Sequence, residues 1–465
     1  MKFNRVLDPR PGRPCRWRGL LMLALLALAP AGHAVETETL PKAVTIQQLL
    51  NIVREKSPRY SALKQRIERS RAEVEAAGVM PNPRLNIGNF SLMSQTNTMY
   101  DGRTQREIIL EVPVLASGQL GARVEAAEKQ VEMTEASVEA DFSALAYDIW
   151  RLFVKLLAGR ERIAILDETH HDMRHLSDLV TGREQAGNAS RYDVLRIDLE
   201  TRDVAARLEN ARNDLLGTAG ELGVALGLPG WNPEALGTLK PLGVPANPDR
   251  LWAEAERSNP EIETARRGEI AAEAGLDRAR SERWPVPSLM FGSAFTENPW
   301  GHAIFGGLSV ELPVFDYGQG GMARAATERQ KAAVERDVVT AQTRGAVDRA
   351  AALLARRQET RARFERDVLG KLGDLKAMGE AAYRFGKGSL LELLDATRSR
   401  TEVRLTHVDL SQAETEAEID ALRAAGLLVN TVDFGTIGQP PAGALPLKTA
   451  GRPGAERRAL IAVPR

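Results

Sequence analysis

The chain has 465 residues, with 62 basic side chains, 62 acidic side chains, six histidines and a single cysteine. Once the predicted export signal, residues 1–34, is removed, 56 basic residues remain against 61 acidic ones, a formal charge of −5 that argues against a nucleic-acid partner. Because Cys15 lies inside that signal, we expect the mature chain to have no disulfide, thiol nucleophile, cysteine metal ligand or acylated cysteine.

Residues 1–34 have the three parts of a secretory signal peptide. Arg13, Arg16 and Arg18 form a basic region before an apolar stretch, Leu20–Ala29, and small residues follow at Gly32–Ala34, where cleavage is expected. After Ala34, no run of the sequence approaches the ~18 apolar residues of a membrane helix. The mature protein is therefore predicted to be exported, and any membrane contact must use another architecture.

The exported part opens with a helix and two strands. Periodicity predicts a helix over Thr45–Met80 with a bend at Pro58, followed by strands at about 84–93 and about 104–114. The second strand alternates between apolar and polar residues, with Ile108, Leu110 and Val112 facing one way and Gln105, Glu107 and Glu111 the other. The apolar face would meet a second sheet in a soluble sandwich, or lipid in an outer-membrane barrel with the glutamates facing a watery lumen.

Long helices follow the strands. The first is predicted over Gly118–Gln185, about 100 Å at ~1.5 Å per residue, and a second helix returns over Ser190–Leu228. A linker rich in proline and glycine, Gly227–Pro248, leads to a third helix over Arg250–Arg283. No ordinary globular core needs a helix of such length, so the rod is expected to span a distance.

The second part of the chain repeats this order. Strands are predicted at about 288–296 and about 303–312, and an uninterrupted long helix over Gly318–Arg384. After a glycine-containing turn, a shorter helix runs over Ser389–Ala425. From Asp433 onward, proline, glycine and alanine dominate without periodicity, which predicts a disordered tail over 433–465.

Matching landmarks recur at one offset and indicate an internal duplication. The offsets are 202, 200 and 199 residues for the pairs Pro58 and Pro260, Pro113 and Pro313, and Gly187 and Gly386. The predicted domains are therefore a signal peptide (1–34), a first repeat (35–246, tip at about 183–191), a second repeat (247–432, tip at about 384–391) and the tail.

Four strands cannot close into a membrane barrel, because the smallest such barrels have ~8 strands and an open edge in lipid leaves backbone groups unpaired. Several copies of the chain would have to share one barrel. The long helices carry mainly small or aliphatic apolar residues, which suits closely packed helix walls. An oligomeric tube with a strand barrel at one end and a helical barrel at the other meets both conditions.

The exported, duplicated chain resembles the TolC family of outer-membrane efflux channels over about residues 45–426. The resemblance rests on the order and spacing of prolines and glycines in both halves and on the tip motifs Asp193-Val194-Leu195 and Leu394-Asp395-Ala396. It implies a mainly α fold with a small membrane β part, in which three chains build a 12-stranded barrel and a long helical barrel in the periplasm. The segment Pro81–Leu85 is similar to the branch that exports heavy metals such as cobalt, zinc, cadmium or copper.

The family also implies partners and candidate site residues. The partners are two further copies of the chain, outer-membrane lipid, a periplasmic membrane-fusion adaptor and an inner-membrane RND-type pump. Acidic rings narrow the periplasmic end in such channels, and Glu392 and Asp395 match those positions, although Glu392 stands where the family pattern has aspartate. Gly187, Gly386 and Gly388 mark the tip turns, where the adaptor is expected to dock. Multidrug efflux and type I secretion are the alternatives within the family.

Simpler interpretations stand beside these. Glu392 and Asp395 could be an acidic i, i+3 pair on a solvated helix face, and His171 with His175 a solvated pair, since no third spaced histidine supports a metal site. We expect no cofactor, no bound metal and no catalysis, because no nucleophile with its base stands out. A periplasmic coiled-coil scaffold or adaptor is the alternative of another class, although no lipoyl-like module is evident.

Overall fold

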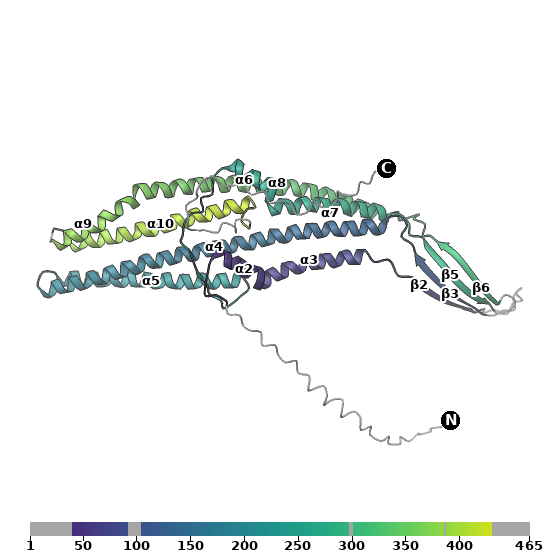
Figure 1. Ribbon diagram of the computed structural model, residues 1–465, viewed down its shortest axis with the longest axis horizontal. Helices are drawn as coiled ribbons and strands as arrows, with labels where there is room; N and C mark the ends of the chain where they lie inside the picture. Colours follow the sequence, from purple (N-terminus) through teal and green to yellow (C-terminus); the bar gives the residue numbers. More distant parts are fainter. Residues whose placement is uncertain (1–39, 92–103, 297–300, 386, 430–465) are drawn as a thin grey trace, which may run out of the picture. The chain divides into compact units, whose positions relative to one another are not determined.

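The computed structural model describes residues 40–91, 104–296, 301–385 and 387–429 (Figure 1). The predicted signal peptide and tail lie outside these residues. The described part is mainly helical with a small β part, as predicted from the sequence. None of its helices is both long enough and apolar enough to cross a bilayer. The helices are α2 (Ile46–Lys56), α3 (Pro58–Ala77), α4 (Gln119–Gln185), α5 (Arg191–Ala225), α6 (Pro248–Ser258), α7 (Pro260–Glu282), α8 (Gln319–Asp367), α9 (Leu372–Arg384) and α10 (Leu390–Ala424), with a 3-10 turn at Leu369–Lys371.

The two long helices differ from each other. Helix α4 runs for 67 residues without a break, as expected. The second was predicted to be equally continuous, and this is wrong: α8 ends at Asp367, and the 3-10 turn separates it from α9. Gly370 and Gly373 lie at this break, and each glycine costs a helix interior about 1 kcal/mol relative to alanine.

The half-length helices meet end to end at two equivalent joints. Ser57 separates α2 from α3, and its hydroxyl donates to the carbonyl of Leu226, just after α5, at 2.7 Å. Asn259 separates α6 from α7, caps α7, and donates to the carbonyl of Ala424, at the end of α10, at 2.9 Å. Each joint is therefore hydrogen-bonded to the C-terminal end of a 35-residue helix, α5 in the first repeat and α10 in the second.

Glycines make the close approach at these joints possible. Gly227 and Gly426 follow α5 and α10 with φ of +73° and +71°, a left-handed conformation that side chains disfavour. At Gly426 an added Cβ would also lie 2.5 Å from the Cα of Asn259, which no side chain could accept. The same cap thus ends the returning helix of both hairpins.

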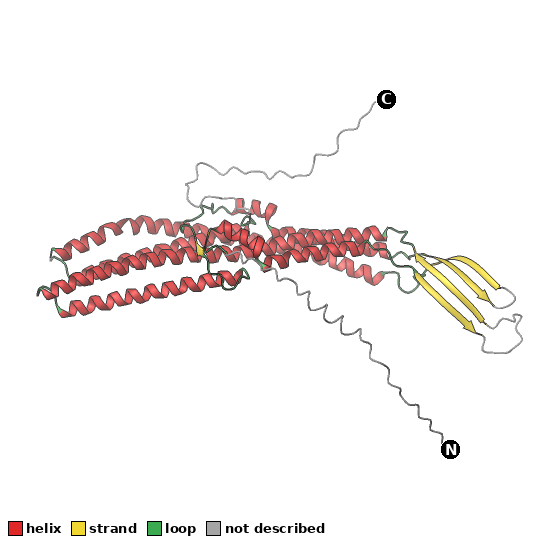
Figure 2. Cartoon of the chain, turned by 60° about the horizontal axis from the view of Figure 1, so that its bottom comes forward, coloured by secondary structure: helices red, strands yellow, loops and turns green. Residues whose placement is uncertain are grey.

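The main sheet has four antiparallel strands in the order β2-β3-β5-β6: Arg84–Ser91, Thr104–Pro113, Ser288–Thr296 and Gly301–Ser309. It projects from one end of the helical part (Figure 2). Strand β6 was predicted to reach residue 312 but ends at Ser309, because its partner β5 begins at Ser288, directly after Pro287, and Ser288 pairs with Ser309. Proline has no N–H with which to extend the ladder.

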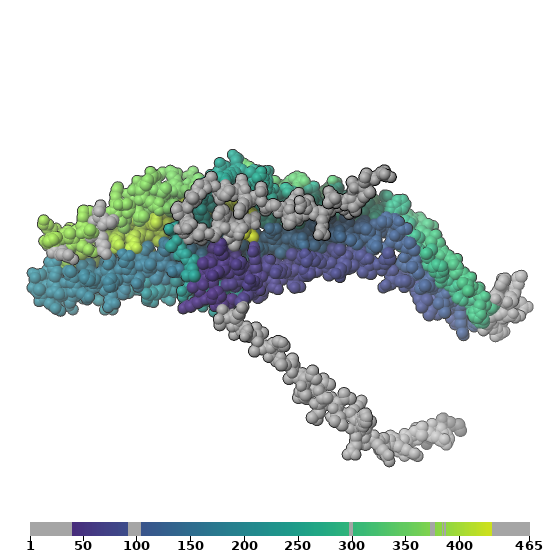
Figure 3. Space-filling model, in the orientation of Figure 1, coloured from purple at the N-terminus to yellow at the C-terminus, as the bar shows by residue number. Residues whose placement is uncertain are grey.

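The linker between the repeats lies against the middle of the helical part. Its short strand β4 (Glu234–Ala235) pairs in parallel with β1 (Ala43–Val44), which precedes α2. Helix α4 has packed neighbours along its length in α3, α5, α7 and α10, whereas α8 packs on α7 and α10. Figure 3 shows the helices of both halves forming one elongated body that continues into the strands.

Candidate functional site

The first hairpin tip is built from a glycine turn and an N-cap. After α4, Gly187 adopts φ +77° and its N–H donates to the carbonyl of Glu184 at 2.9 Å. Ser190 then caps α5: its hydroxyl accepts from the N–H of Asp193, whose carboxylate accepts from the N–H of Ser190 at 3.0 Å. This reciprocal capping box fixes where the returning helix begins.

The second tip uses the same cap with a different turn. Gly386 lies outside the described residues. Gly388 has no left-handed φ; an added Cβ there would lie 3.0 Å from the Cβ of Ala382 on α9, so packing explains this glycine. Ser389 caps α10, and the carboxylate of Glu392 accepts from the N–H of Ser389 at 3.2 Å.

The two candidate constriction residues lie on one exposed face in the first turns of α10, while Leu393 and Leu394 between them are buried. Glu392 is the acidic member of the capping box at the start of α10. This role was not predicted from the sequence. Asp395 makes no hydrogen bond or ion pair with any described residue. It is therefore the freer of the two carboxylates.

A small apolar core holds the two tips together. Buried residues from α4, α5, α9 and α10 contact one another here: Met173, Val180, Ile197, Tyr383, Leu390, Leu393 and Leu394. The guanidinium of Arg183 lies 4.8 Å from the ring centre of Tyr383 and donates to its carbonyl at 3.3 Å. Arg398 on α10 donates through both arms of its guanidinium to the carboxylate of Glu200 on α5, with Nε 2.9 Å from Oε2.

Hydrogen bonds and ion pairs between side chains join α4 to α10 away from the tips. The hydroxyl of Tyr147 donates to Asp420 at 2.7 Å, Arg162 donates to Asp409 at 2.8 Å, and Arg404 donates to Glu168 at 2.7 Å. The bonds from Arg404 and Arg400 hold the pKa of Glu168 below its ordinary value, despite partial burial. Sequence reasoning missed these pairs, because nothing in a single helix shows which charges a distant helix will meet.

One carboxylate on α10 is completely buried. Glu418 accepts from the backbone N–H groups of Leu242, Gly243 and Val244 in the linker, at 2.6, 2.7 and 3.0 Å. Burial raises the pKa of Glu418, while the three amide bonds oppose the rise and the neighbouring Glu414 adds to it. This side chain fastens the linker to the helical part.

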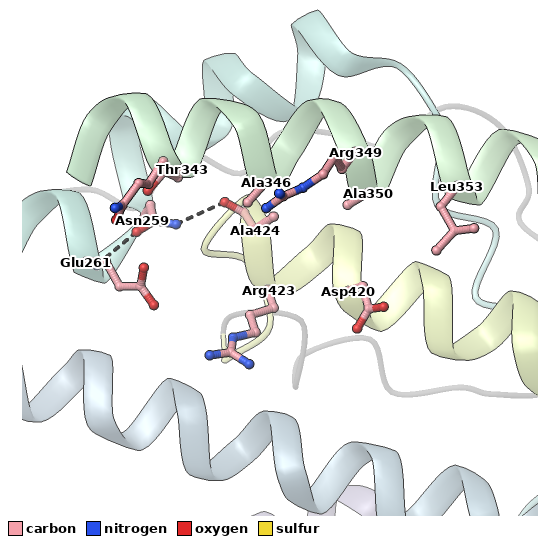
Figure 4. Close-up of a pocket in the computed structure, with 11 residues that line it drawn as sticks. Asn259, Glu261, Thr343, Ala346, Arg349, Ala350, Leu353, Asp420, Arg423 and Ala424 are labelled. Carbon is pink, nitrogen blue, oxygen red and sulfur yellow. Dashed lines mark hydrogen bonds between the residues drawn. The ribbon is translucent and has the colours of Figure 1, made fainter. Parts of the chain in front are cut away.

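The part of the chain that the structure describes offers no metal centre. No group of three or more histidine, cysteine, aspartate or glutamate side chains there could hold a metal ion, and His171 and His175 gather no third ligand. An open depression of about 540 Å³ lies between α7, α8 and α10 (Figure 4). Two of its charged side chains are already engaged: Arg423 lies over the Tyr147 ring at 4.3 Å, and Asp420 accepts from the same tyrosine.

The sheet brings its apolar residues onto one face. Register places Leu85, Leu110 and Phe291 side by side, and the outward residues of β5 are exposed while their neighbours are half-buried. Glu107 and Glu111 lie on the opposite face. This face thus carries the band Leu85, Ile87, Ile108, Leu110, Val112, Leu289, Phe291, Phe295, Ile304 and Leu308.

Comparisons with known proteins agree with this arrangement. Residues 49–228 match the sequence profile of a family described as outer membrane efflux protein. The chain is 23% identical to the cobalt-zinc-cadmium resistance protein CzcC of Cupriavidus metallidurans over 385 residues, covering 78% of this chain and 86% of CzcC. It is 25% identical to the cation efflux system protein CusC of Escherichia coli over 402 residues, covering 81% and 84%. A crystal structure of CusC superposes with a TM-score of 0.65 at 19% identity, covering 82% of this chain and 92% of that one.

Proposed function

Since the chain belongs to the outer membrane efflux protein family, we propose that it is the exit duct of a tripartite system that carries heavy-metal cations across the outer membrane. It is an outer-membrane efflux channel with its helices in the periplasm, and the family is one of transport channels, not of enzymes. The observation that carries the proposal is the sheet: four strands with an exposed apolar face on one side and both strand carboxylates on the other.

The strands and the helices both support the homotrimer that the family implies. Three chains would supply 12 strands, enough to close a barrel, and the open edges β2 and β6 would pair with neighbouring copies. Helix α8 also needs a neighbour: only four of its 49 residues are buried, and Val334 and Val338 remain exposed. In a trimer this surface packs against another chain.

The tips are the proposed docking place for the periplasmic adaptor, which joins the duct to an inner-membrane RND-type pump. The predicted docking glycines are Gly187, Gly386 and Gly388, of which Gly386 lies outside the described residues. Apolar side chains beside Gly187 and Gly388 are exposed, including Tyr192 on α5 and Leu391 on α10. These surfaces lie at the end of the helical part opposite the strands (Figure 1). The pump supplies the energy, and the duct itself is passive.

Asp395 and Glu392 form the proposed constriction of this duct. Three chains place six carboxylates around its periplasmic end, which favours cations and resists full closure through like-charge repulsion. Planar bilayer recordings test this role. Replacing both residues, Glu392→Ala with Asp395→Ala, is expected to raise conductance or weaken block by divalent cations, and unchanged traces would remove them from the constriction. Because Glu392 also caps α10, Glu392→Gln with Asp395→Asn serves as a second variant that keeps side-chain volume.

The cargo is tested by growth of a deletion strain, with and without the restored gene, in zinc, cobalt, cadmium, copper, nickel and a panel of hydrophobic drugs. Metal sensitivity that complementation reverses is the expected result, in line with the resistance and cation efflux proteins to which the chain is similar. Sensitivity to drugs alone would indicate multidrug efflux, and normal growth in all of them would favour a secretion duct. A monomeric protein absent from membranes would instead indicate a periplasmic scaffold or adaptor.

A further inference from the structure

At one end of the sheet, the apolar face carries a row of residues of which three are polar or basic. Register pairs Asn89 with Arg106, Arg106 with Phe295, and Phe295 with His302, so these four residues cross all four strands at one level. Asn89, Arg106 and His302 are exposed, and the rings of Phe295 and His302 lie 4.7 Å apart. The next level of the same face holds Ile87, Ile108 and Ile304, with the small residue Ser293 between the last two.

In the proposed barrel, this row lies at the height of the outer surface of the membrane. It lies at the strand ends remote from the helices, and the helices are periplasmic, so the row faces the outer leaflet (Figure 2). From Val112 to Arg106 the strand advances six residues, about 20 Å at ~3.4 Å per residue. Leu312 and Phe315, which follow β6 at the end of the sheet nearer the helices, are also exposed. With strands tilted by ~35–45°, this length covers roughly 15 Å of the ~25 Å apolar band of outer-membrane barrels, and the row lies at its outer end.

Charge is divided between the two faces of the sheet. Among the described strand residues, Arg84, Glu107 and Glu111 lie on the inner face, whereas the apolar face carries no carboxylate and one permanent charge, Arg106. Arg106 makes no hydrogen bond or ion pair with any described residue. An arginine on the lipid face costs ~2–4 kcal/mol at the midplane of the bilayer but only ~0–1 kcal/mol near its surface, where its guanidinium can reach phosphate oxygens.

We propose that Asn89, Arg106 and His302 form a headgroup site for an acidic, phosphate-bearing lipid of the outer leaflet. Arg106 donates to a phosphate oxygen, and Asn89 supplies a further N–H donor from the adjacent strand β2. His302 supplies another from β6, with Phe295 on β5 lying between Arg106 and His302. The acyl chains of the lipid lie over the apolar rows below. The site rests on the proposed barrel, and each trimer would carry three such sites.

Native mass spectrometry of delipidated trimer with added phosphatidylglycerol or phosphatidylcholine tests the site. Wild-type protein is expected to prefer phosphatidylglycerol. Arg106→Gln should lower this preference about fivefold, the factor that corresponds to ~1 kcal/mol per basic residue near an anionic surface, and His302→Gln should lower it further. Arg106→Lys retains the charge and most of the preference, and Arg84→Gln on the inner face leaves it unchanged.

Two outcomes would overturn the site: equal binding of both lipids by the wild-type trimer, or an unchanged preference in the double variant Arg106→Gln with His302→Gln. The trimer itself is checked in the same spectra. A trimer without lipid preference contradicts only the headgroup site, whereas a wild-type protein that forms no trimer contradicts the proposed function as well.

Discussion

Helices α5 and α10 are the returning arms of the two hairpins, and their comparison shows what the duplication kept. Both have 35 residues. Both begin with a capping box, Ser190 with Asp193 and Ser389 with Glu392, and both are followed by a left-handed glycine, Gly227 or Gly426. The first and last residues of these helices correspond at a constant offset of 199 residues. The caps at both ends therefore set the same length for the two helices.

The side chains between those ends differ. Five residues of α5 are buried against 13 of α10. At the offset of 199 residues, Asp395 corresponds to Arg196, and the buried Glu418 corresponds to Ala219. Both the free carboxylate of the proposed constriction and the carboxylate that fastens the linker therefore belong to the second repeat alone. The two helices are therefore equal in length but differ in the side chains that have a proposed function.

The largest effect is expected at Glu418, which has no counterpart in α5. Replacing it, Glu418→Ala, leaves three amides of the linker without their acceptor, and at the buried amide of Val244 this loss costs ~1–3 kcal/mol. Hydrogen exchange at Leu242, Gly243 and Val244 should accelerate strongly, and the melting temperature of the trimer should fall. The exposed Glu221→Ala on α5 is the control and should change neither quantity. Unaltered protection of these amides would show that Glu418 does not hold the linker.

The pH dependence of this effect has a definite sign. Because the pKa of Glu418 is raised, the folded protein binds its proton more tightly than the unfolded chain does. Its contribution to stability is fully present below the ordinary pKa of glutamate and declines as pH rises through the raised value. The difference in melting temperature between wild type and Glu418→Ala should therefore shrink from acid to neutral pH. A difference that grows with pH would contradict the burial of the carboxyl group.

Removing the shared caps should have equal effects in the two arms. Ser190→Ala and Ser389→Ala each delete one N-cap, a loss of ~1 kcal/mol. Faster amide exchange in the first turn of α5 or α10 is the local measurement, and Ser→Thr at either position should preserve protection. A large effect at one tip with none at the other would contradict the equivalence of the two caps.

The smallest effect is expected at the pair that joins the arms. Arg398 donates to Glu200 across from α10 to α5, but its side chain is 54% exposed, and such pairs contribute ~0.2–1 kcal/mol. A double-mutant cycle with Arg398→Ala and Glu200→Ala, followed by thermal unfolding in low and high salt, measures the coupling. We expect a small coupling that salt weakens. A larger, salt-independent coupling would mean that this pair is shielded in the trimer.

Local signals in the sequence predicted much of this fold. Thr45, Ser190 and Ser389 marked helix starts, Pro58 marked a joint, and alternation along β3 identified its apolar face. The break near Gly370 was missed because the charged periodicity continues on both sides of it. The end of β6 depends on where its partner strand begins, and the amides that meet Glu418 come from a linker 174–176 residues away. Such pairings are set by tertiary packing, which no local pattern encodes.

The number of chains in the membrane-bound protein tests the account most directly, because a four-stranded sheet has to be shared to form a duct. The measurement is native mass spectrometry of protein extracted with detergent from carbonate-washed outer membranes. We predict a complex with three times the mass of the mature chain. Recovery of the protein in the carbonate wash as a single chain would contradict the outer-membrane duct.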